Sequence, residues 1–363
     1  MKYFLCFALG CLTLTSARAF TLKVGDIFVA NYGSNNIIKV DPKTGAEQDW
    51  GAVIQPTDVA PSSDGFIYIT SLNNTVSKLS ICNGLITTLA SGGFLDQPYG
   101  ITLGPSGDLF VTSFANSLVV QVDHLTGAQT LIASGGSLSG PVGIAFNAVG
   151  NLVVANFNTS SLLEINLTNL TNGPQSVIIS GNGLNYPEHL VIDASGSIFV
   201  GTDAYNNPEN IIQQVIPGST TVTNIAAGAY LRSPRGIAIE GGGKLISAQY
   251  DNKRIVRVNP ADGTQSAITV VGGLLNRPYG VAVYNSPTIP PNDCNPLLDI
   301  SQNGLNFVLS WQTNSTGFTL QTTIDLSSSI SWSTVTNAVK VAGQNYTVTV
   351  NADSGTSFFR LAK

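Results

Sequence analysis

The sequence predicts an all-β fold, a six-bladed β-propeller of four-stranded blades followed by a small β-sandwich. The first reason is composition: 363 residues include 37 Gly and 17 Pro but a single Met, which favours short strands and turns over long helices. The second reason is an internal repeat that covers most of the chain. The third is a C-terminal segment in which apolar and polar residues alternate, as in the strands of a sandwich.

Each repeat begins with a strand headed by proline, such as QPYGITLGPSG from Gln97, and a glycine turn leads into a second strand, such as LFVTSF from Leu109. The six prolines are Pro56, Pro98, Pro141, Pro187, Pro234 and Pro278, spaced 42, 43, 46, 47 and 44 residues apart. The second strands start at Ile27, Ile67, Leu109, Leu152, Ile198 and Leu245. A third strand, such as IIKVD from Ile37, and a fourth, such as QTLIAS from Gln129 or SAITVV from Ser266, complete the unit. Four short strands in roughly 40–50 residues are typical of one propeller blade.

The order of these strands predicts how the ring closes. The second strand at Ile27 precedes any first strand, and the first strand at Tyr279 has no second strand after it. We expect residues 279–284 to pair with residues 25–30 as the innermost strand of blade one, because closure removes a long free edge. Strands such as LFVTS and LVVAN are apolar on both faces, which indicates that each blade lies between two neighbours.

The N-terminus has the features of a secretory signal peptide. Lys2 precedes an apolar run that ends near the small-residue site Ala17-Arg18-Ala19, so cleavage is expected before Phe20. The mature protein is then secreted or periplasmic. Cys11 is interpreted as a thiol within this signal, with a lipoprotein cysteine as the alternative. No later apolar run approaches the roughly 20 residues that cross a bilayer, so no transmembrane segment is expected.

The predicted domains follow from these patterns and from a change in composition after the last repeat. They are a signal peptide at 1–19, the propeller at 20–285, a Pro-rich linker at 286–297 and a small β-sandwich at 298–363. Strands of the sandwich are expected at LNFVLSWQT from Leu305, GFTLQTTIDL from Gly317, SWSTVT from Ser331, QNYTVTV from Gln344 and SFFRLA from Ser357. Trp311 and Trp332 are expected in its core, with a carbohydrate platform as the alternative.

Charge and cysteine content exclude some classes of function. The chain has 16 Lys and Arg against 21 Asp and Glu, a net charge of −5, so nucleic acid is not an expected partner. Signal cleavage leaves Cys82 and Cys294, which lack the spacing of a zinc site. We predict a disulfide between them, because export exposes them to an oxidising compartment and the strand order brings both to one face of neighbouring blades.

The repeated strands resemble NHL repeats. Segment PYGITLGPSGDLFVTS, from Pro98, is similar to repeats of streptogramin lyases, and gluconolactonase-like propellers share the same architecture. The resemblance covers about residues 22–285 and implies a six-bladed propeller. It implies no single activity, because the same repeats serve enzymes and binding proteins. The ending SFFRLA resembles the last strand of fibronectin-type-III-like modules.

A propeller binds ligands where the loops that enter the first strands and leave the second strands surround the channel. Aligned by repeat, the candidate ligand-binding residues at this channel mouth are Tyr32, Asp58, Tyr99, Phe114, Asp203, Arg235, Tyr250 and Tyr279. Their aromatic rings suit stacking on sugars or docking of a peptide. The alternative is that the rings pack between blades.

Blade five departs from the repeat. Four units carry glycine after the Pro-x pair, at Gly100, Gly143, Gly236 and Gly280. Blade five carries Glu188-His189 there, and an imidazole beside a carboxylate suits a general base or a metal ligand. The alternative is a surface-loop histidine without such a role. The other histidine, His124, lies in a turn between third and fourth strands and is expected to face solvent.

Candidate catalytic residues are therefore His189 and Glu188. Candidate ligands of a divalent metal, Ca²⁺ or Mg²⁺, are His189, Glu188, Asp203 and Asn156. The resemblance points the same way in part, because streptogramin lyases need a histidine, a carboxylate and a divalent metal at this face. The tryptophan-rich strand ends common in those lyases are absent, however, and Ser71, Ser113 and Thr202 stand in their place.

These patterns favour an exported binding or interaction module that acts through its channel mouth on an extracellular carbohydrate, peptide or protein. The alternative is a metal-assisted lyase or lactonase that uses the same face. Whether the chain is an enzyme is left open, and no cofactor is identified. The sequence contains no Gly-x-Ser-x-Gly, phosphate loop or His-Glu-x-x-His motif, so serine-hydrolase, nucleotide and zincin functions have no support.

Overall fold

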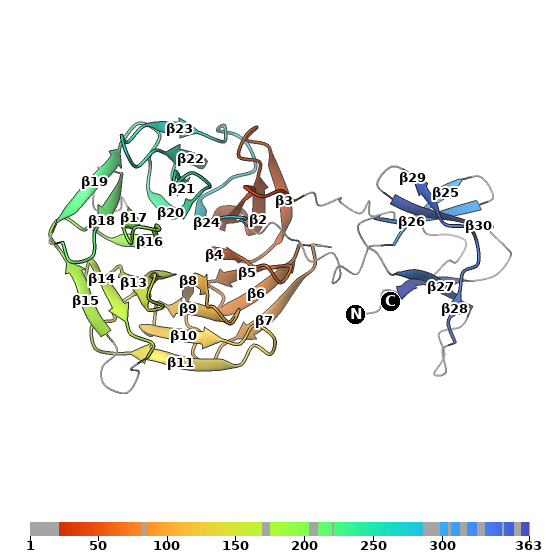
Figure 1. Ribbon diagram of the computed structural model, residues 1–363, viewed down its shortest axis with the longest axis horizontal. Coiled ribbons are helices and arrows are strands. Elements are labelled where there is room, and N and C mark those ends of the chain that lie inside the picture. Colours follow the sequence, from red (N-terminus) through yellow and green to blue (C-terminus); the bar gives the residue numbers. More distant parts are fainter. Residues whose placement is uncertain are drawn as a thin grey trace. The chain divides into compact units, whose positions relative to one another are not determined.

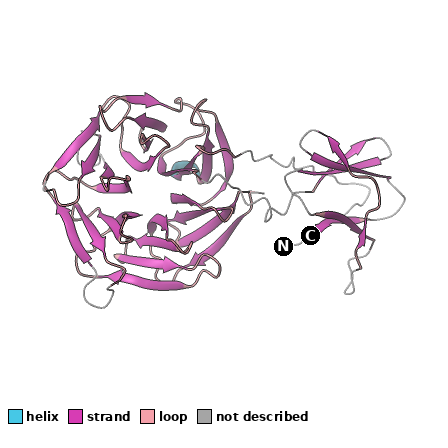
Figure 2. Cartoon of the chain, in the orientation of Figure 1, coloured by secondary structure: helices cyan, strands magenta, loops and turns pink. Residues whose placement is uncertain are grey.

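The structure is a computed structural model in which almost all described residues belong to strands and turns (Figure 2). It describes residues 22–81, 84–168, 175–202, 210–219, 221–285, 298–303, 306–312, 318–324, 331–342, 345–351 and 357–362. These residues fall into two compact units. No helix within those ranges has the length and hydropathy needed to cross a membrane.

The larger unit contains six four-stranded antiparallel sheets arranged as the blades of a ring (Figure 1). Each blade runs from an innermost strand, headed by one of the repeated prolines, to an outermost strand. Blade one consists of β24 (Pro278–Val283), β1 (Ile27–Asn31), β2 (Asn36–Val40) and β3 (Glu47–Ala52), and blade two of β4 (Pro56–Pro61), β5 (Phe66–Ser71), β6 (Thr75–Ser80) and β7 (Ile86–Ser91). Blade three consists of β8 (Pro98–Leu103), β9 (Leu109–Ser113), β10 (Leu118–Val122) and β11 (Gln129–Ser134), and blade four of β12 (Pro141–Phe146), β13 (Leu152–Asn156), β14 (Ser161–Ile165) and β15 (Gln175–Ser180). Blade five consists of β16 (Pro187–Ile192), β17 (Ile198–Thr202), β18 (Ile211–Val215) and β19 (Val222–Ala227), and blade six of β20 (Pro234–Ile239), β21 (Leu245–Gln249), β22 (Arg254–Val258) and β23 (Gln265–Ala267). The all-β, six-bladed fold expected from the sequence is therefore confirmed.

Blade one joins the two ends of the repeat region, as the strand count predicts. Strand β24 pairs antiparallel with β1, with Val283 opposite Ile27 and Val281 opposite Val29. The amide of Tyr284 extends the pairing with a 2.8 Å hydrogen bond to the carbonyl of Asp26. The last first strand of the chain thus completes the first blade.

The apolar core of this unit lies between blades. One cluster combines Ile27 and Val29 of blade one with Ile246 and Ile255 of blade six, and the four other clusters described for the ring also join neighbouring blades. Strand β9 is buried along its whole length, which confirms that strands apolar on both faces lie between two sheets.

The fourth strand of blade six differs from the prediction. A strand was expected over SAITVV from Ser266, but β23 ends at Ala267. The amides of Ile268 and Thr269 both turn toward the carbonyl oxygen of Ile255, at 2.9 and 3.4 Å, so the ladder bulges and stops. Val270, the next residue, is exposed.

The smaller unit consists of two sheets, of strand order β25-β26-β30-β29 and β28-β27-β31. Their bounds are β25 (Asp299–Asn303), β26 (Asn306–Gln312), β27 (Thr319–Thr323), β28 (Ser333–Thr334), β29 (Lys340–Ala342), β30 (Asn345–Asn351) and β31 (Phe358–Ala362). Side chains from both sheets share one core, among them Trp311, Leu320 and Phe359, as in a β-sandwich. Trp332 instead lies half-buried against the guanidinium of Arg360, 4.3 Å from its ring centroid. Strands β25 and β29 were not predicted, and the three residues of β29 are exposed and give no burial pattern.

The β24–β1 pairing predicts how truncation affects folding. Deletion of residues 277–363 should abolish cooperative unfolding of the ring, because it removes the innermost strand of blade one. Deletion of residues 298–363 should leave the ring's cooperative transition intact. Equal effects of the two truncations in thermal or denaturant unfolding would contradict the closure.

Candidate functional site

The candidate site lies at the end of the ring where first strands begin and second strands end. The loops that precede the first strands are fastened to the second strands: the hydroxyl of Ser71 donates to the carbonyl of Ile54 at 2.9 Å, and that of Ser113 to the carbonyl of Phe94 at 3.0 Å. Those channel-mouth residues expected from the repeat that the structure describes therefore lie at one end of the ring.

A repeated backbone geometry positions each first strand at this end. The residue before each repeated proline has positive φ, and these residues are Gln55, Gln97, Gly140, Tyr186, Ser233 and Arg277. The preceding blade holds three of these residues through an asparagine side chain, for example Asn74, whose carbonyl oxygen accepts a 2.9 Å hydrogen bond from the amide of Gln97. This fixes the direction in which the next innermost strand leaves the loop.

The glycines after the Pro-x pair mark the closest approach of neighbouring blades. A Cβ atom at Gly143 in blade four would lie 2.5 Å from the carbonyl oxygen of Glu188 and 2.8 Å from the Cα of His189 in blade five. The equivalent Gly280 in blade one faces the backbone of Thr57 and Asp58 in blade two. Side chains larger than hydrogen do not fit at these positions without displacement of backbone.

Two blades carry a side chain at this position, and the sequence interpretation recognised one of them. His189 in blade five and Asp58 in blade two both stand where the other four blades have glycine. Blades two and five are three places apart in a ring of six, so β4 and β16 face each other across the axis (Figure 1). Their side chains meet there, with Nε2 of His189 3.4 Å from Oδ2 of Asp58.

Both members of this pair are buried, with 4% of His189 and 8% of Asp58 exposed. Backbone amides hold the carboxylate: Val59 donates to Oδ1 at 2.9 Å, and Ile101 donates to Oδ2 at 3.1 Å. Burial alone lowers the pKa of His189, but the carboxylates of Asp58 and Glu188 outweigh both burial and the opposing charge of Arg235. The pKa of His189 therefore lies above its ordinary value. His189 is not a surface-loop histidine.

Glu188 forms a second buried group with residues from blades six and one. Its carboxylate is 2% exposed and accepts hydrogen bonds from the hydroxyl of Tyr279 at 3.0 and 3.2 Å. Nε of Arg235 lies 3.8 Å from the same carboxylate. The Arg235 guanidinium carbon lies 3.9 Å from the ring centroid of Tyr250 and 4.8 Å from that of Tyr279, which are cation–π distances.

The tyrosines near Glu188 are held as neutral phenols. Burial, followed by the charge of Glu188, raises the pKa of Tyr279 well above 10. The same two causes raise the pKa of Tyr99 to about 12. Near neutral pH these side chains therefore offer hydroxyl groups and uncharged ring faces.

The aromatic side chains of this end form one continuous series, which we call the aromatic arc. In order of contact it consists of Tyr250, Tyr32, Tyr279, Tyr99, Phe114, Phe157 and Tyr186. Successive ring centroids are 6.3, 6.1, 5.6, 5.1, 6.3 and 5.2 Å apart. Tyr279 is buried, and the other six residues of the arc are partly exposed.

Two members of the arc were missed by the sequence interpretation. Phe157 follows the second strand of blade four as Phe114 follows that of blade three, so the repeat itself carried the signal. Tyr186 immediately precedes the proline of blade five, where the other blades have no aromatic residue, and only its ring contact with Phe157, at 5.2 Å, identifies it.

The other predicted site residues either make contacts of a different kind or lie outside the residues that the structure describes. The side-chain nitrogen of Asn156 donates to the backbone carbonyl of Ser137 at 2.6 Å, and its side-chain oxygen accepts from the backbone amide of Ser139 at 3.2 Å. The Asn156 side chain therefore holds the loop that contains Ser137 and Ser139. Asp203, Cys82 and Cys294 lie outside the described residues. Within the described ranges, no three His, Cys, Asp or Glu side chains are grouped as metal ligands.

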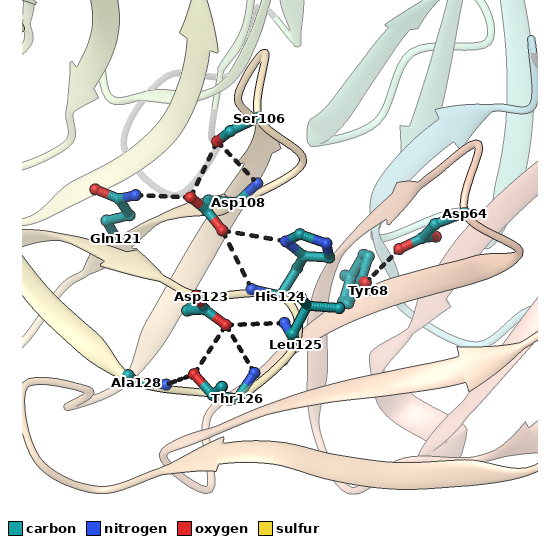
Figure 3. A network of polar contacts seen from close by, with 10 residues as sticks. All are labelled: Asp64, Tyr68, Ser106, Asp108, Gln121, Asp123, His124, Leu125, Thr126 and Ala128. Atoms are coloured by element: carbon teal, nitrogen blue, oxygen red, sulfur yellow. Dashed lines mark hydrogen bonds and ion pairs between the residues drawn. The ribbon is translucent and has the colours of Figure 1, made fainter.

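His124 is half-buried, contrary to the expectation that it faces solvent. Its Nδ1 lies 3.1 Å from Oδ1 of Asp108, and 22% of its side chain is exposed. Figure 3 shows this pair with Gln121, whose amide donates to the other carboxylate oxygen of Asp108 at 2.9 Å. The hydrogen bond between the side chains of Asp108 and His124 is the main cause that lowers the pKa of Asp108. Both residues of this second Asp–His pair belong to blade three.

Comparison with solved structures identifies the class of protein. The chain is similar to a chain of the nidogen/laminin complex, with a TM-score of 0.60 and 17% identity over 71% of this chain and 98% of that one. It is also similar to catalytically inactive virginiamycin B lyase from Staphylococcus aureus with quinupristin, with a TM-score of 0.52 and 16% identity over 85% of this chain and 96% of that one. The larger unit is thus a β-propeller, a likeness of fold alone. No protein-family model and no curated protein matches the sequence.

The Tyr279–Glu188 contact can be tested by removal of one oxygen atom. Tyr279→Phe should lower the free energy of unfolding by about 1–3 kcal/mol, because a buried carboxylate loses its phenol donor. Tyr250→Phe is the matched control and should change stability by less than about 0.5 kcal/mol. Denaturant unfolding of both variants would refute the assignment if their effects were the same.

Proposed function

We propose that this propeller is a binding module whose aromatic arc takes a segment of a protein or peptide partner. The observation that carries the proposal is the continuity of the arc: seven aromatic residues from five blades, six of them partly exposed, follow one another in ring contact at one end of the propeller. Aromatic residues are the side chains most enriched where protein partners bury their contacts.

A second feature favours a polypeptide over a small sugar. The loops that lead into the first strands carry exposed apolar side chains at the same end, and these include Ile54, Phe94, Tyr230 and Leu274. They extend the apolar character of this face beyond the arc. A contact surface of that breadth suits an extended partner, because exposed apolar patches commonly mark protein interaction sites.

The opposite charges of Arg235 and Glu188 balance each other beside Tyr250 and Tyr279, which favours a neutral apolar or aromatic segment there. The cation of Arg235 already lies over the rings of Tyr250 and Tyr279 and beside the carboxylate of Glu188. The ring faces that would otherwise attract a cationic side chain are therefore partly used within the protein.

Selection from a random peptide library displayed on phage tests the proposal. We expect selected peptides to be rich in apolar and aromatic residues. Tyr250→Ala should weaken their affinity at least tenfold, since loss of an aromatic hot-spot contact costs more than about 1.4 kcal/mol. Leu125→Ala, at an exposed apolar residue in a turn between third and fourth strands, is the control and should bind as the wild type does. Capture of oligosaccharides but no peptides would contradict a polypeptide partner.

The second candidate is a metal-assisted lyase or lactonase. The observation in its favour is a buried imidazole beside a carboxylate near the ring axis, with Nε2 of His189 3.4 Å from Oδ2 of Asp58, an arrangement that suits a general base. Elemental analysis after equilibration with Ca²⁺ or Mg²⁺ separates the two functions. Stoichiometric metal that is lost in His189→Gln would favour the enzyme over the binding module.

Export and the disulfide belong to the same proposal. A secreted propeller with residues 1–19 removed would meet its partner outside the cell, and a bridge between Cys82 and Cys294 would stabilise it there. The intact mass of the exported protein should be that of a chain that begins at Phe20. It should also be lower, by the mass of two hydrogen atoms, than the mass of the same chain with both cysteines reduced. Titration of two free thiols in the unreduced, denatured protein would reject the bridge.

A further inference from the structure

The positive charges at the end of the ring that carries the aromatic arc are concentrated in one sector. Among the described residues of this end, Lys and Arg occur only in blade six and in the loops beside it, at Arg232, Arg235, Lys253, Arg254 and Arg277. Strand β24 packs against β20 and β21, so the loops and turns that carry these residues are neighbours (Figure 1). This concentration of cations contrasts with the net charge of −5 of the chain.

Four of these cations have no acidic partner among the described residues. No ion pair there includes any of the four, which we call the cationic sector: Arg232, Lys253, Arg254 and Arg277. Arg235 lies beside Glu188 and is not included. Arg254 is half-buried, and the other three are exposed. Nη1 of Arg232 donates to the carbonyl of Leu231 at 2.8 Å, a contact with no acid. The sector therefore offers positive charge to an external group.

Acidic residues beside the cationic sector are fewer than its cations. Asp251 is exposed in the turn between β21 and β22. Glu47 of blade one reaches the loop before β24, where its carboxylate accepts hydrogen bonds from the amides of Leu274 and Leu275. Within the described residues, which exclude 203–209, the four cations therefore outnumber these two acids.

The cationic sector adjoins the aromatic arc. The guanidinium carbon of Arg277 lies 5.8 Å from the ring centroid of Tyr250, the first residue of the arc. The guanidinium carbon of Arg254 lies 5.8 Å from the ring centroid of Tyr230, an exposed side chain at the same end. Cation–π contact at such distances orients a guanidinium but leaves its charge in place. A partner that covers the arc near Tyr250 therefore also meets these cations.

We infer that the partner segment carries acidic side chains, which bind the cationic sector while its neutral apolar and aromatic residues cover the arc. This inference rests on the proposed function. Carboxylates are the matching chemistry, because a guanidinium can donate two parallel hydrogen bonds to one carboxylate. Restriction of the cations to one sector favours an acidic peptide over a nucleic acid, since a phosphate backbone is bound by cations along its whole path.

Peptides selected from the phage library are the probes that test this inference. Those selected on the wild type should be enriched in Asp and Glu relative to the unselected library. Those selected on the triple variant Lys253→Gln/Arg254→Gln/Arg277→Gln should not. An acidic peptide selected on the wild type should bind the triple variant about tenfold more weakly at about 0.05 M salt, the loss expected for three exposed ion pairs. At about 0.5 M salt the two affinities should be similar, because salt screens exposed charges but leaves contacts with the arc.

The matched control removes the same number of positive charges from the other end of the ring. Lys23, Lys43 and Lys244 are exposed, and they precede β1, connect β2 to β3 and precede β21. The variant Lys23→Gln/Lys43→Gln/Lys244→Gln should select acidic peptides and bind them as the wild type does. An equal loss of affinity in both triple variants would show an effect of net charge alone and would overturn the inference.

The remaining outcomes separate this inference from the proposed function. Selected peptides without an excess of Asp and Glu, bound equally by the wild type and the cationic-sector variant at low salt, would overturn the acidic partner and leave polypeptide binding intact. Failure to select any peptide would overturn the proposed function and the inference with it. Single-stranded oligonucleotides of mixed sequence that bind the wild type more tightly than any selected peptide, and fail to bind the cationic-sector variant, would overturn the inference in favour of nucleic acid.

Discussion

The pairing of β24 with β1 is the interaction on which the rest of the structure depends. It joins residues separated by almost the whole length of the ring and removes the free edges that an open array of blades would expose. It also brings Tyr279 to the axis, where the tyrosine contacts Glu188 of blade five and four other aromatic or imidazole rings. Ring closure and assembly of the candidate site are therefore one event.

The close approach of innermost strands determines what else can lie at the axis. Glycine at four of the six equivalent positions lets neighbouring backbones approach within the space that a Cβ would fill. The two exceptions, Asp58 and His189, fall on opposite blades and complement each other in charge. Glu188 is balanced by Arg235 in the same way. The buried charged residues of the site are therefore paired with one another, and aromatic side chains such as Tyr250 lie against them.

Much of this arrangement could be predicted from the sequence, since a repeat of proline, glycine and apolar strands specifies both blade and closure. The channel-mouth location of Tyr99, Arg235 and Tyr279 followed from the same alignment. The Asp58–His189 contact was missed because each residue was compared with the repeat separately and not with the blade opposite. The early end of β23 could not be predicted, because it depends on Ile255, in a neighbouring strand, accepting two amides.

Amide hydrogen exchange in β24 tests the central claim most directly. This strand is innermost in its blade and its ladder partner is β1, so its protection reports on closure alone. The equivalent strand β8 is joined to its partner β9 by a short turn and is the internal reference. Closure predicts similar protection of the ladder amides in β24 and β8. Rapid exchange in β24 beside a protected β8 would show that the ring is open and would contradict the account.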